Sequence, residues 1–197
     1  MTGSARRRSG PDRGATMLEF VLVLPFLLLM AFGTAEMGLA WVANNRVEGT
    51  TSTAGRIGAS SGSLAEADRN ILLSIKTSLP PQELARLDRV IIYKPTDADG
   101  TVPAACIKAP GDSSQVGASA QCNTYTGATV RAITSSTDLG SADDYWAPAT
   151  RKDKLVGPPD RIGVWLRTTH PAQTGTFWTD FTITKASIYR VQPDIKG

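Results

Sequence analysis

An apolar run from Ala15 to Ala35 constrains this chain more than any other feature of its sequence. As a helix that rises 1.5 Å per residue, the run would span about 31 Å, roughly the thickness of the hydrocarbon core of a bilayer. Pro25 lies inside it and should kink the helix or remove one backbone hydrogen bond, which membrane helices tolerate. Glu19 is its only charged residue. The run therefore predicts a transmembrane helix that contains a single acid.

The charge of the chain is concentrated before this run. Residues 1–14 hold four arginines and one aspartate, whereas the whole chain has 21 basic and 18 acidic residues and a net charge of +3. Everything after the leader therefore balances to zero. Because Lys and Arg favour the cytoplasmic flank of a membrane helix, we expect a cytoplasmic leader and an extracytoplasmic remainder. A neutral remainder has no basic surface for nucleic acid, so that class of partner is excluded.

A short motif, Gly14-Ala-Thr-Met-Leu-Glu19-Phe20, stands at the junction of leader and apolar run. Cleavage after Gly14 would make Ala15 the first residue and Glu19 the fifth. The freed α-amino group would be positively charged near neutral pH. Glu19 of a neighbouring subunit would neutralise it, so that each charge satisfies the other within the membrane. The alternative is that Glu19 lies at the cytoplasmic interface and is hydrated.

The motif resembles the processing site of type IV pilin-like proteins. A longer pattern is similar to the TadE-like pseudopilins of the Tad (tight adherence, Flp) pilus system, and consists of Arg13-Gly14-Ala15, Glu19-Phe20, Leu24-Pro25, Phe32-Gly33 and Glu36. The resemblance covers residues 13–48. It implies cleavage after Gly14 by a membrane-embedded prepilin peptidase. It also implies, as partners, other pilin or pseudopilin subunits and the Tad inner-membrane platform proteins. Phe20, where many Tad major pilins have tyrosine, suits the pseudopilin branch.

The helical pattern continues beyond the membrane. Small or apolar residues recur at spacings of three and four, at Ala43, Val47, Thr50, Ala54 and Ile57. This stripe is expected to pack against the chain's own head, or alternatively against other subunits. A turn at 58–62 follows. Then Ser63-Leu-Ala-Glu66 predicts a capping box that opens a second helix, which Pro80-Pro81 ends.

Residues 80–197 predict a small head with an antiparallel sheet of at least three strands. The strands are expected at 89–94, at 161–169 and, as one long or bulged strand, over 177–191. Residues 95–160 are rich in loop-forming residues, with one short element at 128–134.

Cys106 and Cys122 are the only cysteines in the chain, and both lie in this loop-rich region. Outside the cytoplasm we expect them to form a disulfide, with two unpaired thiols as the alternative.

The predicted fold class is therefore α+β, a pilin-like lollipop. Its parts are a basic cytoplasmic leader (1–14), a transmembrane helix (15–41, with its apolar core ending at Ala35), a helical stalk with the second helix (42–79) and the head (80–197). We expect a single-pass protein of the cell membrane that can enter an extracellular pilus, in contact with membrane lipid.

The sequence contains no catalytic constellation, so we expect no enzyme, cofactor or metal site. His170, the only histidine, precedes Pro171 in an expected surface turn (170–175). Glu36, near the outer end of the apolar run, is expected in interfacial water or against a partner subunit. Four aspartates could offer oxygen ligands but lack the spacing of a calcium loop: Asp97, Asp99, Asp143 and Asp144. Three tryptophans are expected in the core of the head: Trp146, Trp165 and Trp178.

Two other classes remain open from the sequence. The leader and apolar run also resemble a secretory signal peptide, with Gly33-Thr-Ala35 as the cleavage site of a secreted domain. Alternatively, residues 1–35 form an uncleaved signal anchor for an extracellular enzyme or ligand-binding head. The position at which the mature chain begins distinguishes these readings.

Overall fold

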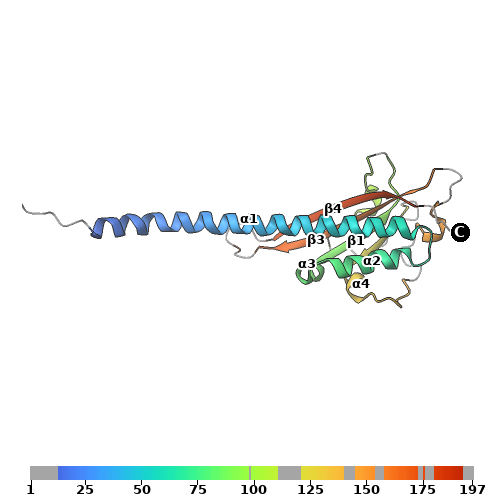
Figure 1. Cartoon of the computed structure of the whole chain (residues 1–197), viewed down its shortest axis with the longest axis horizontal. Coiled ribbons are helices and arrows are strands. Elements are labelled where there is room, and N and C mark those ends of the chain that lie inside the picture. The colour runs from blue at the N-terminus through green and yellow to red at the C-terminus, as the bar shows by residue number, and fades with distance from the viewer. Residues whose placement is uncertain are drawn as a thin grey trace, which may run out of the picture.

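The computed structural model describes residues 13–97, 99–110, 121–139, 145–153, 158–172, 175 and 180–192, with side chains from Met17 onward. One helix, α1 (Arg13–Ser61), dominates the molecule: its first half projects alone and its second half lies along a small head (Figure 1). Its 49 residues make it about 73 Å long. The helix runs through most of the turn expected at 58–62 and ends before Gly62, whose φ of +53° is the left-handed conformation typical of a helix end.

Small residues let the second half of α1 lie close to the head. The expected stripe is largely buried, as Ala43, Val47 and Ala54 are at most 1% exposed. A Cβ added at Gly55 would lie 2.7 Å from the Tyr189 ring and 2.6 Å from Ser187 Oγ. The stripe therefore packs against the chain's own head, because a larger side chain at Gly55 would push the sheet away from α1.

The head contains one antiparallel sheet in the order β2-β1-β3-β4. Its strands are β1 (Leu87–Tyr93), β2 (Cys122–Thr126), β3 (Arg161–Pro171) and β4 (Asp180–Arg190). Neighbouring strands all run antiparallel, with Ile91 of β1 opposite both Thr124 of β2 and Trp165 of β3. The three expected strands are confirmed, and β2 is an addition within the region expected to be irregular.

The two faces of the sheet bury different sets of side chains. Val90, Ile92, Val164 and Leu166 point toward α1 and the second helix and form the main core. The opposite face holds a second cluster around the two cysteines, made of Ile91, Tyr93, Cys106, Cys122 and Trp165. The alternation expected along residues 161–169 is therefore present, and it assigns one face of the sheet to each core.

Three short helices and two 3₁₀ turns complete the described part of the head. They are α2 (Ala67–Ser78), α3 (Pro81–Ala85), α4 (Gly127–Ala132) and two 3₁₀ turns, η1 (Ala104–Cys106) and η2 (Pro148–Thr150). The expected capping box is wrong. Glu66 is the N-cap of α2 and makes no side-chain cap hydrogen bond, while the Ser63 hydroxyl donates to Asp153 instead.

A buried polar network joins α2 to β2 and to the residues on either side of η2. Asp68 pairs with Arg151, and both side chains are at most 3% exposed. The same carboxylate accepts hydrogen bonds from Asn123 Nδ2 at 2.6 Å and from Tyr125 Oη at 3.0 Å. The Asn123 amide also pairs with the backbone of Trp146. These contacts hold β2 at the edge of the sheet.

Candidate membrane and assembly site

The candidate processing and assembly residues lie at the start of α1. Helix α1 begins at Arg13, so the backbone of Gly14 and Ala15 belongs to its first turn, while their side chains lie outside the described set. Glu19 and Phe20 are exposed, Phe20 by 58%. Glu19 follows Ala15 by four residues, which puts it on the same helix face about 6 Å further along.

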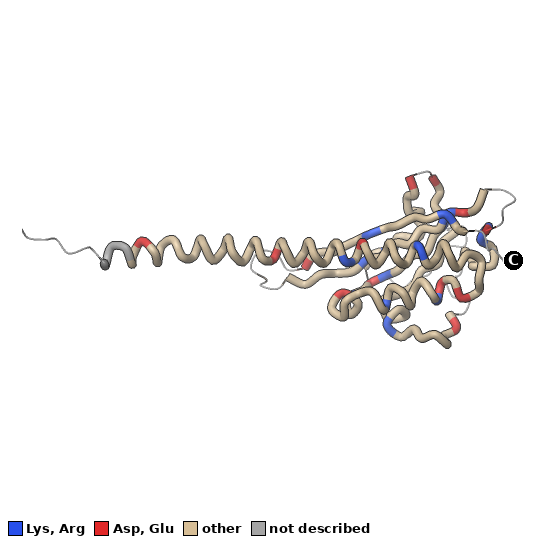
Figure 2. Tube along the Cα trace, in the orientation of Figure 1, with Lys and Arg blue, Asp and Glu red and all other residues tan. Residues whose placement is uncertain are grey.

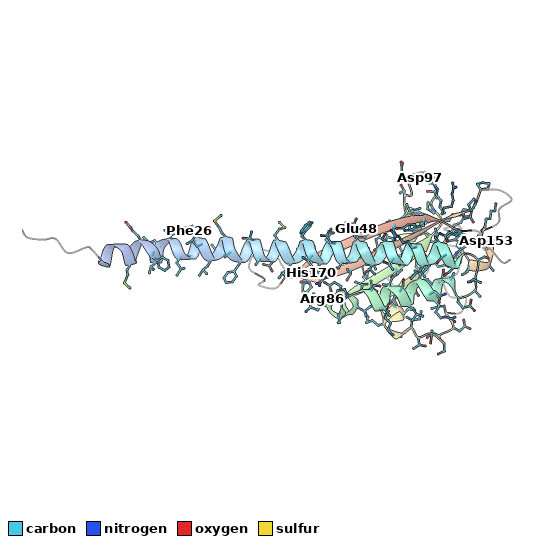
Figure 3. All side chains as sticks on the ribbon, viewed as in Figure 1. Phe26, Glu48, Arg86, Asp97, Asp153 and His170 are labelled. Atoms are coloured by element: carbon cyan, nitrogen blue, oxygen red, sulfur yellow. A yellow bond between two sulfur atoms is a disulfide. The ribbon has the colours of Figure 1, made fainter. Side chains whose placement is uncertain are left out.

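The projecting part of α1 is apolar on every side. Between Met17 and Glu36, Glu19 is the only charged residue, and the rest of that length of the tube is tan in Figure 2. From Met17 to Phe32, twelve large apolar side chains are between 44% and 75% exposed, and Phe26 points outward in Figure 3. Within the described residues, α1 is the one helix long and apolar enough to cross a membrane, by length and composition. Pro25 lies inside this helix without ending it.

Glu36 was expected in interfacial water, but it is buried. Its residue is 4% exposed, whereas Met37 beside it is 59% exposed. The chain's own atoms therefore cover Glu36 at the point where the head first reaches α1. The expectation failed because it treated the helix as isolated at this level.

His170 is also not in a surface turn. It lies in β3, is 7% exposed and stacks near Phe181, with ring centroids 5.2 Å apart. Its Nδ1 is 3.6 Å from Oε1 of Glu83, which is also buried. Strand β3 pairs with β1 only as far as Thr168, but it pairs with β4 as far as Pro171. At Pro171 only β4 is beside the strand, so the missing N–H is tolerated.

The aspartates and tryptophans singled out in the sequence do not come together in one site among the described residues. Asp97 accepts hydrogen bonds from the backbone N–H groups of Gly100 and Thr101, and those from Thr101 are the main reason that its pKa is lowered. Asp143, Asp144 and Trp178 lie outside the described residues. Trp146 and Trp165 are buried, as expected. Among the described residues, no three His, Cys, Asp or Glu side chains are grouped so that they could hold a metal ion.

A disulfide joins Cys106 to Cys122, with Cα atoms 6.3 Å apart. Both cysteines are fully buried beneath the outer face of the sheet. Residues 111–120 of the loop that it closes are not described. The bond attaches η1 to the first residue of β2, so it fixes the start of the edge strand.

The arrangement defines a class of protein: one long apolar helix, able to cross a membrane, that carries an α+β head at its far end. The comparisons with known proteins specify the helix further. Residues 14–56 match the family model of the TadE-like protein. The match begins at the glycine of the expected processing motif and confirms the resemblance to TadE-like proteins. A TadE-like domain relates the chain to the Tad pilus. No curated protein and no solved structure matches it.

Proposed function

We propose that this chain is a membrane-anchored minor pilin or pseudopilin that takes part in assembly of a Tad-type pilus, and so in adhesion or secretion. The observation that carries the proposal is the TadE-like match over residues 14–56, which coincides with the apolar, uncovered part of α1 and its entry into the head. In this proposal α1 anchors the subunit until it is drawn laterally into a filament or an initiating complex.

Processing is the first step. A prepilin peptidase cuts between Gly14 and Ala15, which removes the basic leader and its cytoplasmic arginines. The new amino group then lies at the positive end of the α1 dipole, where two like charges are unfavourable without an anion. Glu19 of a neighbouring subunit supplies that anion. Because a pair of opposite charges costs less in apolar surroundings than either charge alone, the pair favours assembly and fixes the axial position of adjacent subunits.

Substitution of Glu19 tests the assembly step. Glu19→Ala should reduce pilus output strongly, because the neighbour's amine then has no anion. Glu48→Ala is the matched control: Glu48 is an acid on the same helix, but it lies in the head, is 64% exposed and pairs with Lys185 at 3.1 Å. The measurement is pilus recovered from the cell surface, together with co-purification of the chain with other pilus subunits.

Both variants must be cleaved after Gly14, as checked by mass, so that a processing defect is not mistaken for an assembly defect. Unchanged pilus output and unchanged co-purification in the Glu19→Ala strain would show that the charge pair has no role. Loss of both in the Glu48→Ala strain as well would assign the effect to the helix in general.

A further inference from the structure

The exposed apolar surface of α1 continues past Ala35. Met37 is 59% exposed, Leu39 48%, Trp41 67% and Val42 41%. The first polar residue after them that faces solvent is Asn45. From Met17 to Val42 the large apolar side chains of the helix therefore remain uncovered, over a length greater than the apolar run in the sequence indicates.

These additional side chains surround most of the helix. At 100° per residue, Glu36, Ala40 and Ala43 share the side on which the head lies, and they are half-buried or buried. The four exposed residues lie at roughly 100°, 140°, 240° and 300° from Glu36 and so cover the rest of the circumference. A partner helix would require one apolar stripe, whereas a helix that is apolar all round is typical of a membrane span. The surroundings that fit this surface are therefore lipid.

Glu36 does not interrupt the surface, because the chain's own head covers it. Contacts between β4 and α1 show how far the head extends along α1 toward its N-terminus. Tyr189 of β4 bonds to Ser52, and Lys185 pairs with Glu48. Continuing five residues along β4 from Lys185 to Asp180 adds about 17 Å, or about eleven residues of helix. The ends of β3 and β4 at Pro171 and Asp180 therefore reach the level of Glu36, and Figure 1 shows the strands extending back along α1 in that direction.

We propose that the lipid-facing segment of this chain is Phe20–Val42, with the ends of β3 and β4 at Pro171 and Asp180 within the outer interfacial layer. The segment is about 34 Å long, which spans a hydrocarbon core of about 30 Å when the helix is tilted by roughly 25–30°. Trp41 then lies at the outer interface, where tryptophan is favoured. The inference rests on the membrane anchoring in the proposed function and is independent of processing and assembly.

Quenching of tryptophan fluorescence by brominated phospholipid tests this placement. The full chain is inserted in nanodiscs at one chain per disc, in a Trp178→Phe background, since Trp178 lies outside the described residues. The Trp41 signal is the difference between this protein and the same protein carrying Trp41→Phe. Two reference variants in the Trp41→Phe, Trp178→Phe background are Phe32→Trp, in the middle of the apolar segment, and Thr53→Trp, on the exposed face of α1 beside the head.

We expect lipid brominated near the carbonyl end of its acyl chains to quench Trp41 at least two-fold, and lipid brominated near the methyl end to quench it less. Phe32→Trp should show the reverse order, and Thr53→Trp should not be quenched. Trp41 quenching as weak as that of Thr53→Trp, with Phe32→Trp quenched, would overturn the placement and leave the membrane anchor intact. An unquenched Phe32→Trp would overturn the anchor as well. Loss of Trp41 quenching only when several chains share a disc would assign the surface to a second copy.

Discussion

At the scale of single residues, the head depends on Asp68, where α2, β2 and the residues on either side of η2 meet. Its carboxylate accepts from Arg151, Asn123 and Tyr125, all of them buried or nearly so. The Arg151 guanidinium also lies 4.6 Å from the centroid of the Trp146 ring. Since neither charge reaches water, each depends on the other.

Arg151→Met should therefore destabilise the chain by about 3–5 kcal/mol, because it leaves the Asp68 carboxylate buried without its cation. Urea denaturation of the full chain in detergent, followed by tryptophan fluorescence, measures the loss. Arg86→Met is the matched control, since Arg86 pairs with Asp180 at the surface and both are more than 40% exposed. A surface pair contributes at most about 1 kcal/mol. Equal effects of the two substitutions would contradict the importance of the buried network.

The raised pKa of Tyr93 leads us to expect a loss of stability at alkaline pH. The pKa of Tyr93 is raised from an ordinary value of 10.0 to about 12, mainly by burial and secondly by the nearby Asp97 carboxylate. Its hydroxyl donates to the Gly100 carbonyl at 2.9 Å. Because the folded state holds the proton more tightly, the stabilisation is complete below pH 10 and is lost as the pH rises to about 12.

The free energy of unfolding should fall by about 2–3 kcal/mol over this range, apart from the contribution of other groups. Denaturation at a series of pH values measures it, and Tyr93→Phe provides the comparison because it cannot ionise. The free energy of unfolding of Tyr93→Phe should decline less steeply at alkaline pH. Parallel curves for the two proteins would show that Tyr93 does not titrate differently in the folded and unfolded states.

At the scale of elements, close packing of α1 on β4 depends on glycine. Gly55→Ala should destabilise the chain by about 1–3 kcal/mol, because the new methyl group would overlap the Tyr189 ring and Ser187. Gly49→Ala is the control on the same helix: nothing lies within 4 Å of its Cβ position, so alanine should stabilise the helix by about 0.5–1 kcal/mol. Thermal unfolding by circular dichroism compares them. A stabilising Gly55→Ala would mean that β4 does not lie against α1 at this residue.

The disulfide should stabilise the edge of the sheet. Its cysteines are 16 residues apart, and a crosslink of this span contributes about 3 kcal/mol in the chain-entropy model. Replacing both Cys106 and Cys122 with alanine should therefore lower the melting temperature by about 6–12 °C. Reduction of the unmodified protein should give a similar shift. If neither treatment moves the melting temperature, the bond does not constrain the head.

Elements with strong periodicity could be predicted from the sequence, and elements held by distant partners could not. Residues 161–169 alternate clearly and form most of β3. By contrast, Cys122–Thr126 is short and largely polar, and it forms β2 because Asn123 and Tyr125 reach Asp68 from far along the chain. Ser63 fits a capping box locally but bonds to Asp153.

The candidate site divides in the same way. The motif from Gly14 to Phe20 and the apolar run depend only on local sequence, so they could be identified directly. The burial of Glu36 and the apolar surface up to Val42 depend on where the head meets α1, which is set by tertiary packing. The runs of small residues at 43–55 were the one signal in the sequence that the head would approach the helix closely.

At the scale of the whole molecule, the structure separates anchoring from folding. The first half of α1 contributes no side chain to the core before Ala43, apart from the covered Glu36, and the second half is part of the head. A rigid helix that continues from one part to the other would transmit the position of the membrane segment directly to the head. This arrangement suits a subunit that is drawn into an assembly by its helix.

The central claim is that this helix is matured as a prepilin. The most direct test is the N-terminal sequence and intact mass of the chain, taken from the membrane fraction of a host that contains the peptidase. The account predicts a membrane-bound chain that begins at Ala15, and a Gly14→Leu variant that keeps its leader. A soluble chain beginning near Glu36 would indicate an ordinary signal peptide, and an intact membrane-bound chain beginning at Met1 would indicate an uncleaved anchor. Either result would contradict maturation as a pilin.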